Sequence, residues 1–159
     1  RWGKLTLDAR VFPAAALAMD RPNPRNALGT ALLSSATACA DISDGLAQDL
    51  GHILERSGVD ADVLWDAVPK HPALAALSQE QQVEAAMSGG DDYELVFTAP
   101  ADKRGLIEQA SISALTPVTR IGRIVEKKPS GAPLAIRDAS GRPLFLPVQG
   151  FDHFAQSAD

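Results

Sequence analysis

Cysteine and aromatic residues are scarce in this chain of 159 residues, which has one cysteine and only 5% aromatic residues. A single cysteine, Cys39, excludes a disulfide within the chain. We expect it to pack in the core as a small apolar side chain without a chemical role. Basic residues are also in the minority, with 15 lysines and arginines against 20 aspartates and glutamates, a net charge of −5. This balance argues against a nucleic-acid partner.

Long apolar runs are absent too, and the first residues lack the charged-then-apolar pattern of a signal peptide. We therefore expect a soluble, cytoplasmic protein with no membrane partner. The chain starts at Arg1 inside an alternating segment, which suggests a fragment of a larger protein. We expect residues 1–20 to end a preceding domain or form a linker, and residues 21–159 to form one domain, because this length supports one substantial core and not two.

The common nucleotide and calcium signatures are missing. The chain contains neither G-x-x-x-x-G-K-[ST] nor G-x-G-x-x-G. The loop that starts at Asp41 is not an EF-hand, because its glycine falls at position five rather than six and His52 occupies position twelve. Any nucleotide or metal must therefore be held in another way.

The segment D-I-S-D-G-L at 41–46 is the most informative that is present. It joins a predicted apolar strand over 37–42 to a helix over 44–57, and such junctions bind phosphates and metals in α/β proteins. At about 4 Å, the charges of Asp41 and Asp44 would repel by roughly 1 to 4 kcal/mol, which a divalent cation would reverse. The alternative is structural: Asp41 ends the strand, and Ser43 or Asp44 caps the helix.

Periodicity predicts an α+β (layered α/β) fold with one mixed β-sheet flanked by helices. After a helix from about Pro13, the predicted helices are 27–35, 44–57, 73–77, 79–87 and 102–113, and the predicted strands are 37–42, 61–65, 93–98 and 118–125, followed by a hairpin over 134–146 that turns near 140–141. We expect Gly58 to end the second of these helices. His52 and Asp49 are expected on its solvated side.

Two further segments carry polar groups. The sequence S-G-G-D-D-Y-E-L at 88–95 brings a double glycine, which lets the backbone approach a ligand closely, before Asp91 and Asp92. A helix stop followed by a polar turn explains the same residues. Near the end, G-F-D-H-F at 150–154 places Phe151 and Phe154 in a terminal tail. Phe151 can stack on a flat heterocycle or, like Phe154, dock on the protein body.

Together, five segments resemble the C-terminal half of the thiamine-monophosphate kinases, within the superfamily of aminoimidazole ribonucleotide synthetase: R-P-x-P-R at 21–25, D-I-S-D-G-L at 41–46, D-L-G-H at 49–52, G-G-D-D-Y-E-L at 89–95 and G-F-D-H-F at 150–154. The resemblance implies the α+β fold of that C-terminal domain, transfer of the γ-phosphoryl group of ATP to thiamine monophosphate, and a homodimeric full-length protein. Charge-neutralising cations and rigid positioning, rather than a covalent nucleophile, suit that reaction.

The resemblance also implies a role for five residues. Asp41 and Asp44 would bind Mg²⁺, Ser43 would contact the phosphates of ATP, and Asp91 and Phe151 would line the thiamine pocket. Two positions depart from the family pattern, since relatives commonly carry Glu at 91 and often Tyr at 151. The family's N-terminal half is absent, so we expect the chain alone to be inactive. A sister enzyme with another acceptor and a binding module without catalysis stay open as alternatives.

Overall fold

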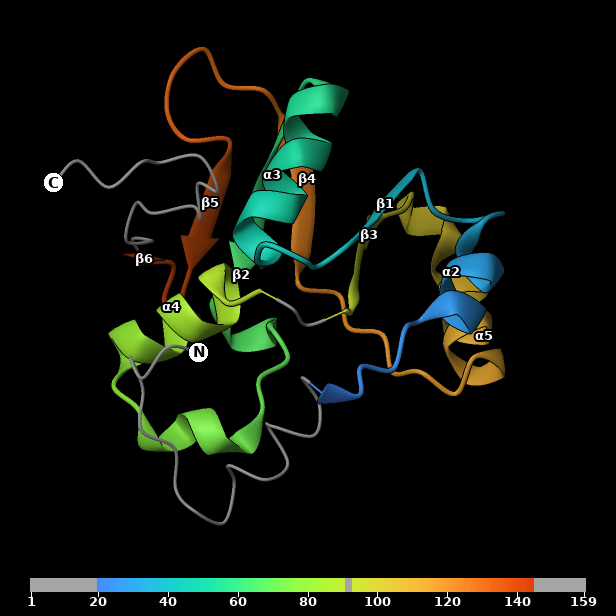
Figure 1. Ribbon diagram of the computed structural model, residues 1–159. Helices are drawn as coiled ribbons and strands as arrows, with labels where there is room; N and C mark the ends of the chain where they lie inside the picture. The colour runs from blue at the N-terminus through green and yellow to red at the C-terminus, as the bar shows by residue number, and fades with distance from the viewer. Residues whose placement is uncertain (1–19, 91–92, 145–159) are drawn as a thin grey trace, which may run out of the picture.

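The computed structural model describes residues 20–90 and 93–144. In chain order the elements are α2 (Asn26–Leu32), β1 (Ala38–Asp41), α3 (Leu46–Ser57), β2 (Val59–Leu64), the 3-10 helices η1 (Trp65–Ala67) and η2 (Pro72–Ala76), α4 (Gln79–Ser88), β3 (Leu95–Thr98), η3 (Ala101–Lys103), α5 (Arg104–Ser113), β4 (Gly122–Glu126), β5 (Leu134–Arg137) and β6 (Pro143–Leu144) (Figure 1). The α+β class is confirmed. The helix predicted from Pro13 lies outside the described residues.

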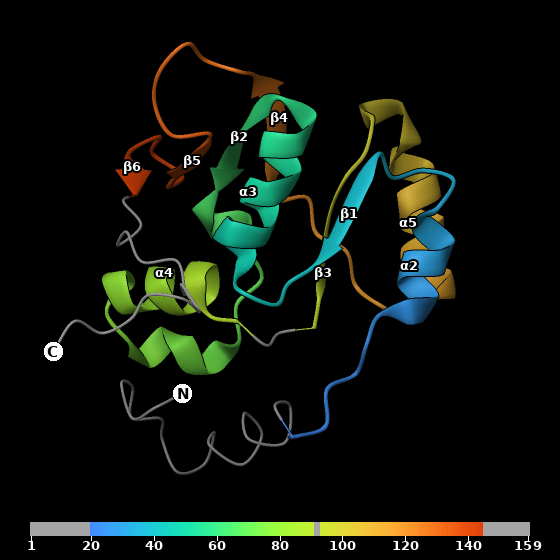
Figure 2. The same cartoon turned by 45° about the horizontal axis from the view of Figure 1, so that its top comes forward.

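The described strands form two sheets, so the prediction of one sheet is wrong. A four-stranded sheet has the order β4-β2-β5-β6 and is mixed, because β2 is parallel to β5 and the other pairs are antiparallel. Strands β1 and β3 form a separate antiparallel pair. This pair lies between two groups of helices, with α3 on one side and α2 and α5 on the other (Figure 2).

Alternation along the two paired strands explains how the pair separates two apolar cores. Ala40 of β1 and Val96 of β3 contribute to the larger core with α3, whereas Leu95 and Phe97 pack on the smaller core under α2 and α5. Helices therefore pack on both faces of the short pair, which does not join the larger sheet. Burial of one leucine or valine side chain contributes roughly 1.5 to 3 kcal/mol.

Helix α3 buries the apolar face that its spacing predicts, formed by Leu46, Leu50, Ile53 and Leu54. The helix ends at Gly58, as expected, because this glycine adopts the left-handed conformation with φ of 65°. The expected cap is wrong. Gly45, with φ of 122°, stands at the N-cap without a side-chain cap hydrogen bond, so neither Ser43 nor Asp44 caps the helix.

Strand β3 is shorter than predicted, since it begins at Leu95 rather than Tyr93. Tyr93 has φ of 55°, which lies in the left-handed region and is incompatible with a strand. The hairpin is confirmed as far as Leu144, and its turn contains Gly141 at φ of 82°. The loops on either side of β3 and β1 are where the predicted site residues lie.

Candidate functional site

The loop at 41–45 and the glycines at 89–90 lie in direct contact, although some 45 residues separate them. A Cβ atom added to Gly90 would lie 2.3 Å from the carbonyl oxygen of Ser43, and one on Gly45 would lie 3.0 Å from that of Met87. Both glycines are therefore required by close backbone approach. The structure brings together two of the segments that the sequence singled out.

Backbone hydrogen bonds fix the relative positions of these two segments. The N–H of Ile42 donates to the carbonyl oxygen of Glu94 at 2.8 Å, and that of Tyr93 donates to the carbonyl oxygen of Ile42 at 3.2 Å. In the β1–β3 ladder, Asp41 is paired with Leu95. The last residue of β1 thus stands beside the start of β3. The two acidic residues Asp91 and Asp92, which precede Tyr93 in the sequence, lie outside the described residues.

Arg25 joins the third segment, R-P-x-P-R, to the same place. Its guanidinium makes two hydrogen bonds to the carboxylate of Glu94, from Nε at 2.9 Å and from a terminal nitrogen at 2.6 Å. The hydrogen bond and the charge of Glu94 raise the pKa of Arg25, against the opposing effect of burial. A two-pronged pair of this kind fixes orientation as well as distance. The arm at 21–25 is thereby connected to the residues after the double glycine.

Asp49 holds the loop from inside, and sequence reasoning missed this role. Its Oδ2 atom accepts hydrogen bonds from three consecutive backbone N–H groups, at 2.9 Å from Ser43, 3.1 Å from Asp44 and 3.2 Å from Gly45. Asp49 is only 6% exposed, so its expected place on the solvated side of α3 is wrong. Of that pair, only His52 is exposed. The sequence feature that could have indicated this role is the position of Asp49, one helical turn after the glycine at which the helix starts.

The predicted ligands on this loop differ in exposure. Asp41 and Ser43 are exposed, whereas Asp44 is partly buried and accepts a hydrogen bond from Gln48 Nε2 at 3.4 Å. Asp41 also lines a surface hollow of about 610 Å³, together with Arg25, Cys39 and Tyr93. The hollow therefore places a carboxylate and a guanidinium at one opening.

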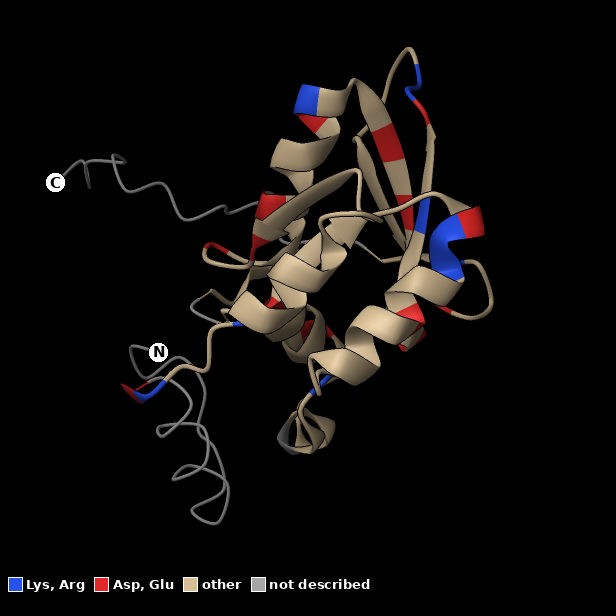
Figure 3. Ribbon diagram, turned by 90° about the vertical axis from the view of Figure 1, so that its right-hand side faces the viewer, with Lys and Arg blue, Asp and Glu red and all other residues tan. Residues whose placement is uncertain are grey.

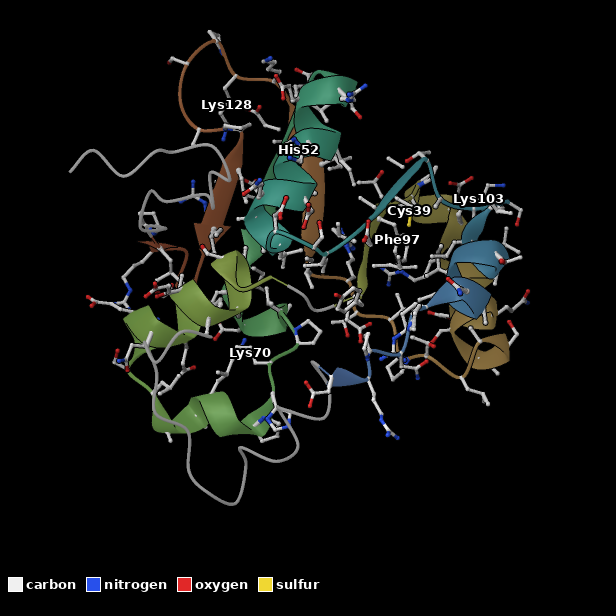
Figure 4. The ribbon with its side chains drawn as sticks, viewed as in Figure 1. Cys39, His52, Lys70, Phe97, Lys103 and Lys128 are labelled. Carbon is white, nitrogen blue, oxygen red and sulfur yellow. The ribbon has the colours of Figure 1, made fainter. Side chains whose placement is uncertain are left out.

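Cys39 lines this hollow rather than the core, so its predicted packing is wrong. It faces the same side of the β1–β3 pair as Phe97, its register partner (Figure 4). Desolvation, and then the negative charge of Asp41, raise the pKa of its thiol. A thiol with a raised pKa is a poor nucleophile at neutral pH, which agrees with giving Cys39 no chemical role.

The segment of the sequence that carries the loop is acidic. The stretch between Arg25 and Arg56 contains Asp41, Asp44 and Asp49 but no lysine or arginine. Elsewhere, basic residues are scattered among acidic ones, as the view in Figure 3 shows. Repulsion among carboxylates makes this loop a place where a bound cation would be stabilised.

The two carboxylates of the loop suit an Mg²⁺ ion whose remaining ligands come from substrate phosphates and water. Within residues 20–90 and 93–144, no three histidine, cysteine or acidic side chains gather to hold a metal ion. Mg²⁺ is often bound by only one or two carboxylates together with substrate phosphates and water. Asp41 and Asp44 fit that pattern as oxygen donors. Asp91 and Phe151, the predicted substrate residues, lie outside the part of the chain that the structure describes.

The described helices include none with the length and apolar character needed to cross a membrane.

Comparison with known proteins gives consistent results. A family model, AIR synthase related protein, C-terminal domain, matches residues 10–133. Over 139 residues the chain is 42% identical to the thiamine-monophosphate kinase of Haemophilus influenzae, covering 86% of this chain and 42% of that protein. The chain also matches the crystal structure of thiamine-monophosphate kinase from Stenotrophomonas maltophilia, with 41% sequence identity and a TM-score of 0.72. This match covers 82% of this chain and 41% of that one.

A third relative carries ligands. The structure of AaThiL complexed with AMPPCP and TMP is 28% identical with a TM-score of 0.67, and the match covers 89% of this chain and 41% of that one. The chain thus spans less than half the length of the relatives it matches. These similarities confirm the resemblance seen in the sequence. With the family model covering most of its length, the chain belongs to the AIR synthase related protein family as a C-terminal domain.

Proposed function

We propose that this chain is the C-terminal domain, over residues 21–159, of an enzyme that transfers the γ-phosphoryl group of ATP to thiamine monophosphate, giving thiamine diphosphate and ADP. The observation that carries the proposal is the contact between the 41–45 loop and the 89–90 glycines. It brings the acidic loop, which is predicted to bind a metal ion, next to the glycines that precede the predicted substrate residue Asp91. The names of the similar proteins, and the relative complexed with AMPPCP and TMP, support the same substrates.

The roles of individual residues belong to this proposal. Asp41 and Asp44 would hold Mg²⁺, and Ser43, exposed between them, would contact the phosphates of ATP. Asp91 and Phe151 would line the thiamine pocket. When bound, Mg²⁺ neutralises phosphate charge and orients the reacting groups.

The chain's own contribution is positioning. The loop at 41–45 presents its acids in a fixed backbone conformation because Asp49 and the β1–β3 pair restrain it. The Arg25–Glu94 pair holds the residues after the substrate segment. Such rigid placement of two anions for in-line transfer is the main requirement of phosphoryl transfer.

The proposal includes a cytoplasmic location and a homodimeric full-length protein, and it assigns residues 1–20 to a preceding domain or linker. It also requires the portion of the relatives that this chain does not span, because phosphate transfer needs more ligands than two carboxylates. We therefore propose that the chain alone lacks activity.

The test is formation of thiamine diphosphate from ATP, thiamine monophosphate and Mg²⁺, measured for the full-length protein and for this chain. We expect activity only in the full-length protein. Substitution of Asp41 or Asp44 by Asn should lower the rate at least about 100-fold, by analogy with losses at metal sites. Asp62→Asn, on β2 and paired with Arg123, is a control that should retain activity.

Two results would contradict this assignment. Transfer to a different acceptor by the full-length protein would indicate a sister enzyme of the same superfamily. Nucleotide binding without transfer to any acceptor would indicate a binding module.

A further inference from the structure

Tyr93 is an aromatic residue in a backbone conformation that bulky residues rarely adopt. Its φ of 55° lies in the left-handed region, which glycine and asparagine enter with much less strain. Hydrogen bonds to β1 impose this conformation. The N–H of Tyr93 donates to the carbonyl oxygen of Ile42 at 3.2 Å, and the carbonyl oxygen of Glu94 accepts from the N–H of Ile42 at 2.8 Å. The end of β1 therefore holds the backbone of Tyr93 and its neighbour in place.

The ion pair between Arg25 and Glu94 restrains the same backbone from the other direction. Its two hydrogen bonds, at 2.9 Å and 2.6 Å, hold the side chain that follows directly after Tyr93. A strained residue persists where its surroundings determine the conformation, and such residues gather at ligand sites. Asparagine or glycine would meet the same backbone requirement with less strain. The backbone therefore gives no reason for an aromatic side chain at this position.

The side chain of Tyr93 is also not part of the apolar interior. It belongs to neither core cluster, is 37% exposed, and lines the hollow of about 610 Å³ beside β1. Pro24, Leu33 and Leu95 give this hollow an apolar wall. Its volume lies within the range of sites that bind small molecules. A partly exposed aromatic side chain is thus available to a ligand of that size.

The charges at the hollow indicate which ligand suits it. Among the described residues that line it, only Arg25 and Asp41 are charged, and Arg25 is already paired with Glu94. A polyphosphate such as that of ATP would meet no free guanidinium here. A ligand with one phosphate and a cationic aromatic ring suits it better, because the face of a tyrosine ring attracts a cation. Thiamine monophosphate has this combination, since its thiazolium ring carries a permanent positive charge.

We propose that Tyr93 is a specificity-determining residue whose ring packs on the thiazolium ring of thiamine monophosphate in this hollow, an inference that rests on the proposed function. The phosphate of the acceptor then lies toward Asp41, the proposed metal ligand at the same hollow. The restrained backbone of Tyr93 holds the ring for this contact. Tyr93 therefore governs the affinity for the acceptor and not the affinity for ATP.

The first test compares two substitutions in the full-length protein. Tyr93→Leu keeps an apolar side chain and removes the aromatic face, whereas Tyr93→Phe keeps the ring. We expect the KM for thiamine monophosphate to rise about 10-fold in Tyr93→Leu, the size of a single cation–aromatic contact. It should stay unchanged in Tyr93→Phe, and the KM for ATP should stay unchanged in both. An equal rise for Leu and Phe would overturn the ring contact.

The matched control uses the second strained position. Leu115 has φ of 50°, is 91% exposed and does not line the hollow, so Leu115→Asn and Tyr93→Asn make the same kind of change at two places. We expect only Tyr93→Asn to raise the KM for thiamine monophosphate. A melting-temperature change without any change in this KM would make Tyr93 a purely structural residue. A comparable rise in the KM for ATP would also overturn the proposal.

A second measurement does not depend on catalysis. Isothermal titration calorimetry of thiamine monophosphate into the full-length protein, with Mg²⁺ and without ATP, should show about 10-fold weaker binding to Tyr93→Leu than to the wild type. If this difference appears in a protein that transfers no phosphate, the proposed function fails while the role of Tyr93 stands. If the wild type transfers phosphate and both proteins bind equally, the role of Tyr93 fails while the proposed function stands.

Discussion

Two loops of this molecule are each held by one aspartate that accepts backbone N–H groups, and they differ in how the charge is balanced. In the turn after β5, Asp138 binds the amides of Ser140 and Arg142 and forms an ion pair with the Arg142 side chain at 2.9 Å. In the loop before α3, Asp49 has no such cation among the described residues. The Asp138 carboxylate is thus paired with a cation inside its own five-residue turn, whereas the Asp49 carboxylate is held by backbone amides.

The comparison extends to other local features. Gly90 near the loop and Gly122 in β4 both leave no room for a Cβ atom, and Tyr93 and Leu115 are the non-glycine residues with positive φ among those described. Each feature thus occurs both near the acidic loop and away from it. Stability depends on both copies, but activity should depend only on the first, so paired substitutions separate the two roles.

The largest expected effect comes from Gly90→Ala compared with Gly122→Ala. The new Cβ would meet the Ser43 carbonyl at 2.3 Å in the first variant and the Asp62 carbonyl at 2.2 Å in the second. We expect each to lower the free energy of unfolding by about 1 to 3 kcal/mol. Only Gly90→Ala should also lower phosphoryl transfer by about 100-fold, because it displaces the acidic loop.

Chemical denaturation and transfer assays on the full-length protein measure both quantities. Gly51→Ala, within α3 and without any atom in 4 Å of the added Cβ, is a control for the effect of alanine itself. It should raise helix stability by about 0.5 to 1 kcal/mol. Equal losses of activity in the Gly90 and Gly122 variants would contradict a local role for the loop contact.

Next in size is Arg25→Ala compared with Arg123→Ala. Arg25 is 26% exposed and makes two hydrogen bonds to Glu94, whereas Arg123 is 68% exposed in its pair with Asp62. Solvent screening limits both, so we expect losses of about 1 kcal/mol and at most about 0.5 kcal/mol. The same denaturation measurement should show the order. Arg25→Lys should not restore the loss fully, because lysine lacks the two-pronged geometry, and a full recovery would refute that reason.

Periodicity in the sequence predicted much of this architecture. The four-residue and three-residue spacing from Leu46 to Leu54 predicted the buried face of α3, and Gly58 predicted its end. These features depend on local sequence, which determines helix faces and stops. The hairpin after Leu134 was predicted for the same reason.

The remaining features depend on contacts between distant residues. Nothing near Cys39 in the sequence indicates that its side chain lies at a surface hollow rather than in the core. The separation of β1–β3 from the larger sheet depends on which helices cover each face. The Asp49 anchor was missed because a polar residue next to His52 resembles a solvated helix position, and only the conformation of residues 43–45 directs their amides inward.

A smaller effect is expected from relieving backbone strain away from the loop. Leu115 is 91% exposed and has φ of 50°, a conformation that asparagine adopts more readily than leucine. Leu115→Asn should therefore raise the free energy of unfolding by about 0.5 to 1 kcal/mol without changing activity. Leu33, 82% exposed with φ of −54°, is the control, since Leu33→Asn relieves no strain. A similar gain in both variants would show that removing exposed apolar surface, not strain, is the cause.

The smallest effect at neutral pH concerns Asp138 itself. It tests whether Ser140 and Arg142 stabilise the ionised carboxylate of Asp138. The hydrogen bond from Ser140, together with the amide and charge of Arg142, lowers the pKa of Asp138 from 3.8 to about 2. Because the pKa is lower in the folded state, this carboxylate contributes stability that is fully present above pH about 4 and is lost as the pH falls through about 2. Nuclear magnetic resonance titration of the Asp138 side chain should give this low midpoint, and Asp138→Asn should flatten the acid dependence of stability between those values. A midpoint near 4 would mean that Ser140 and Arg142 do not hold the carboxylate, and the contrast with Asp49 in charge balance would fail.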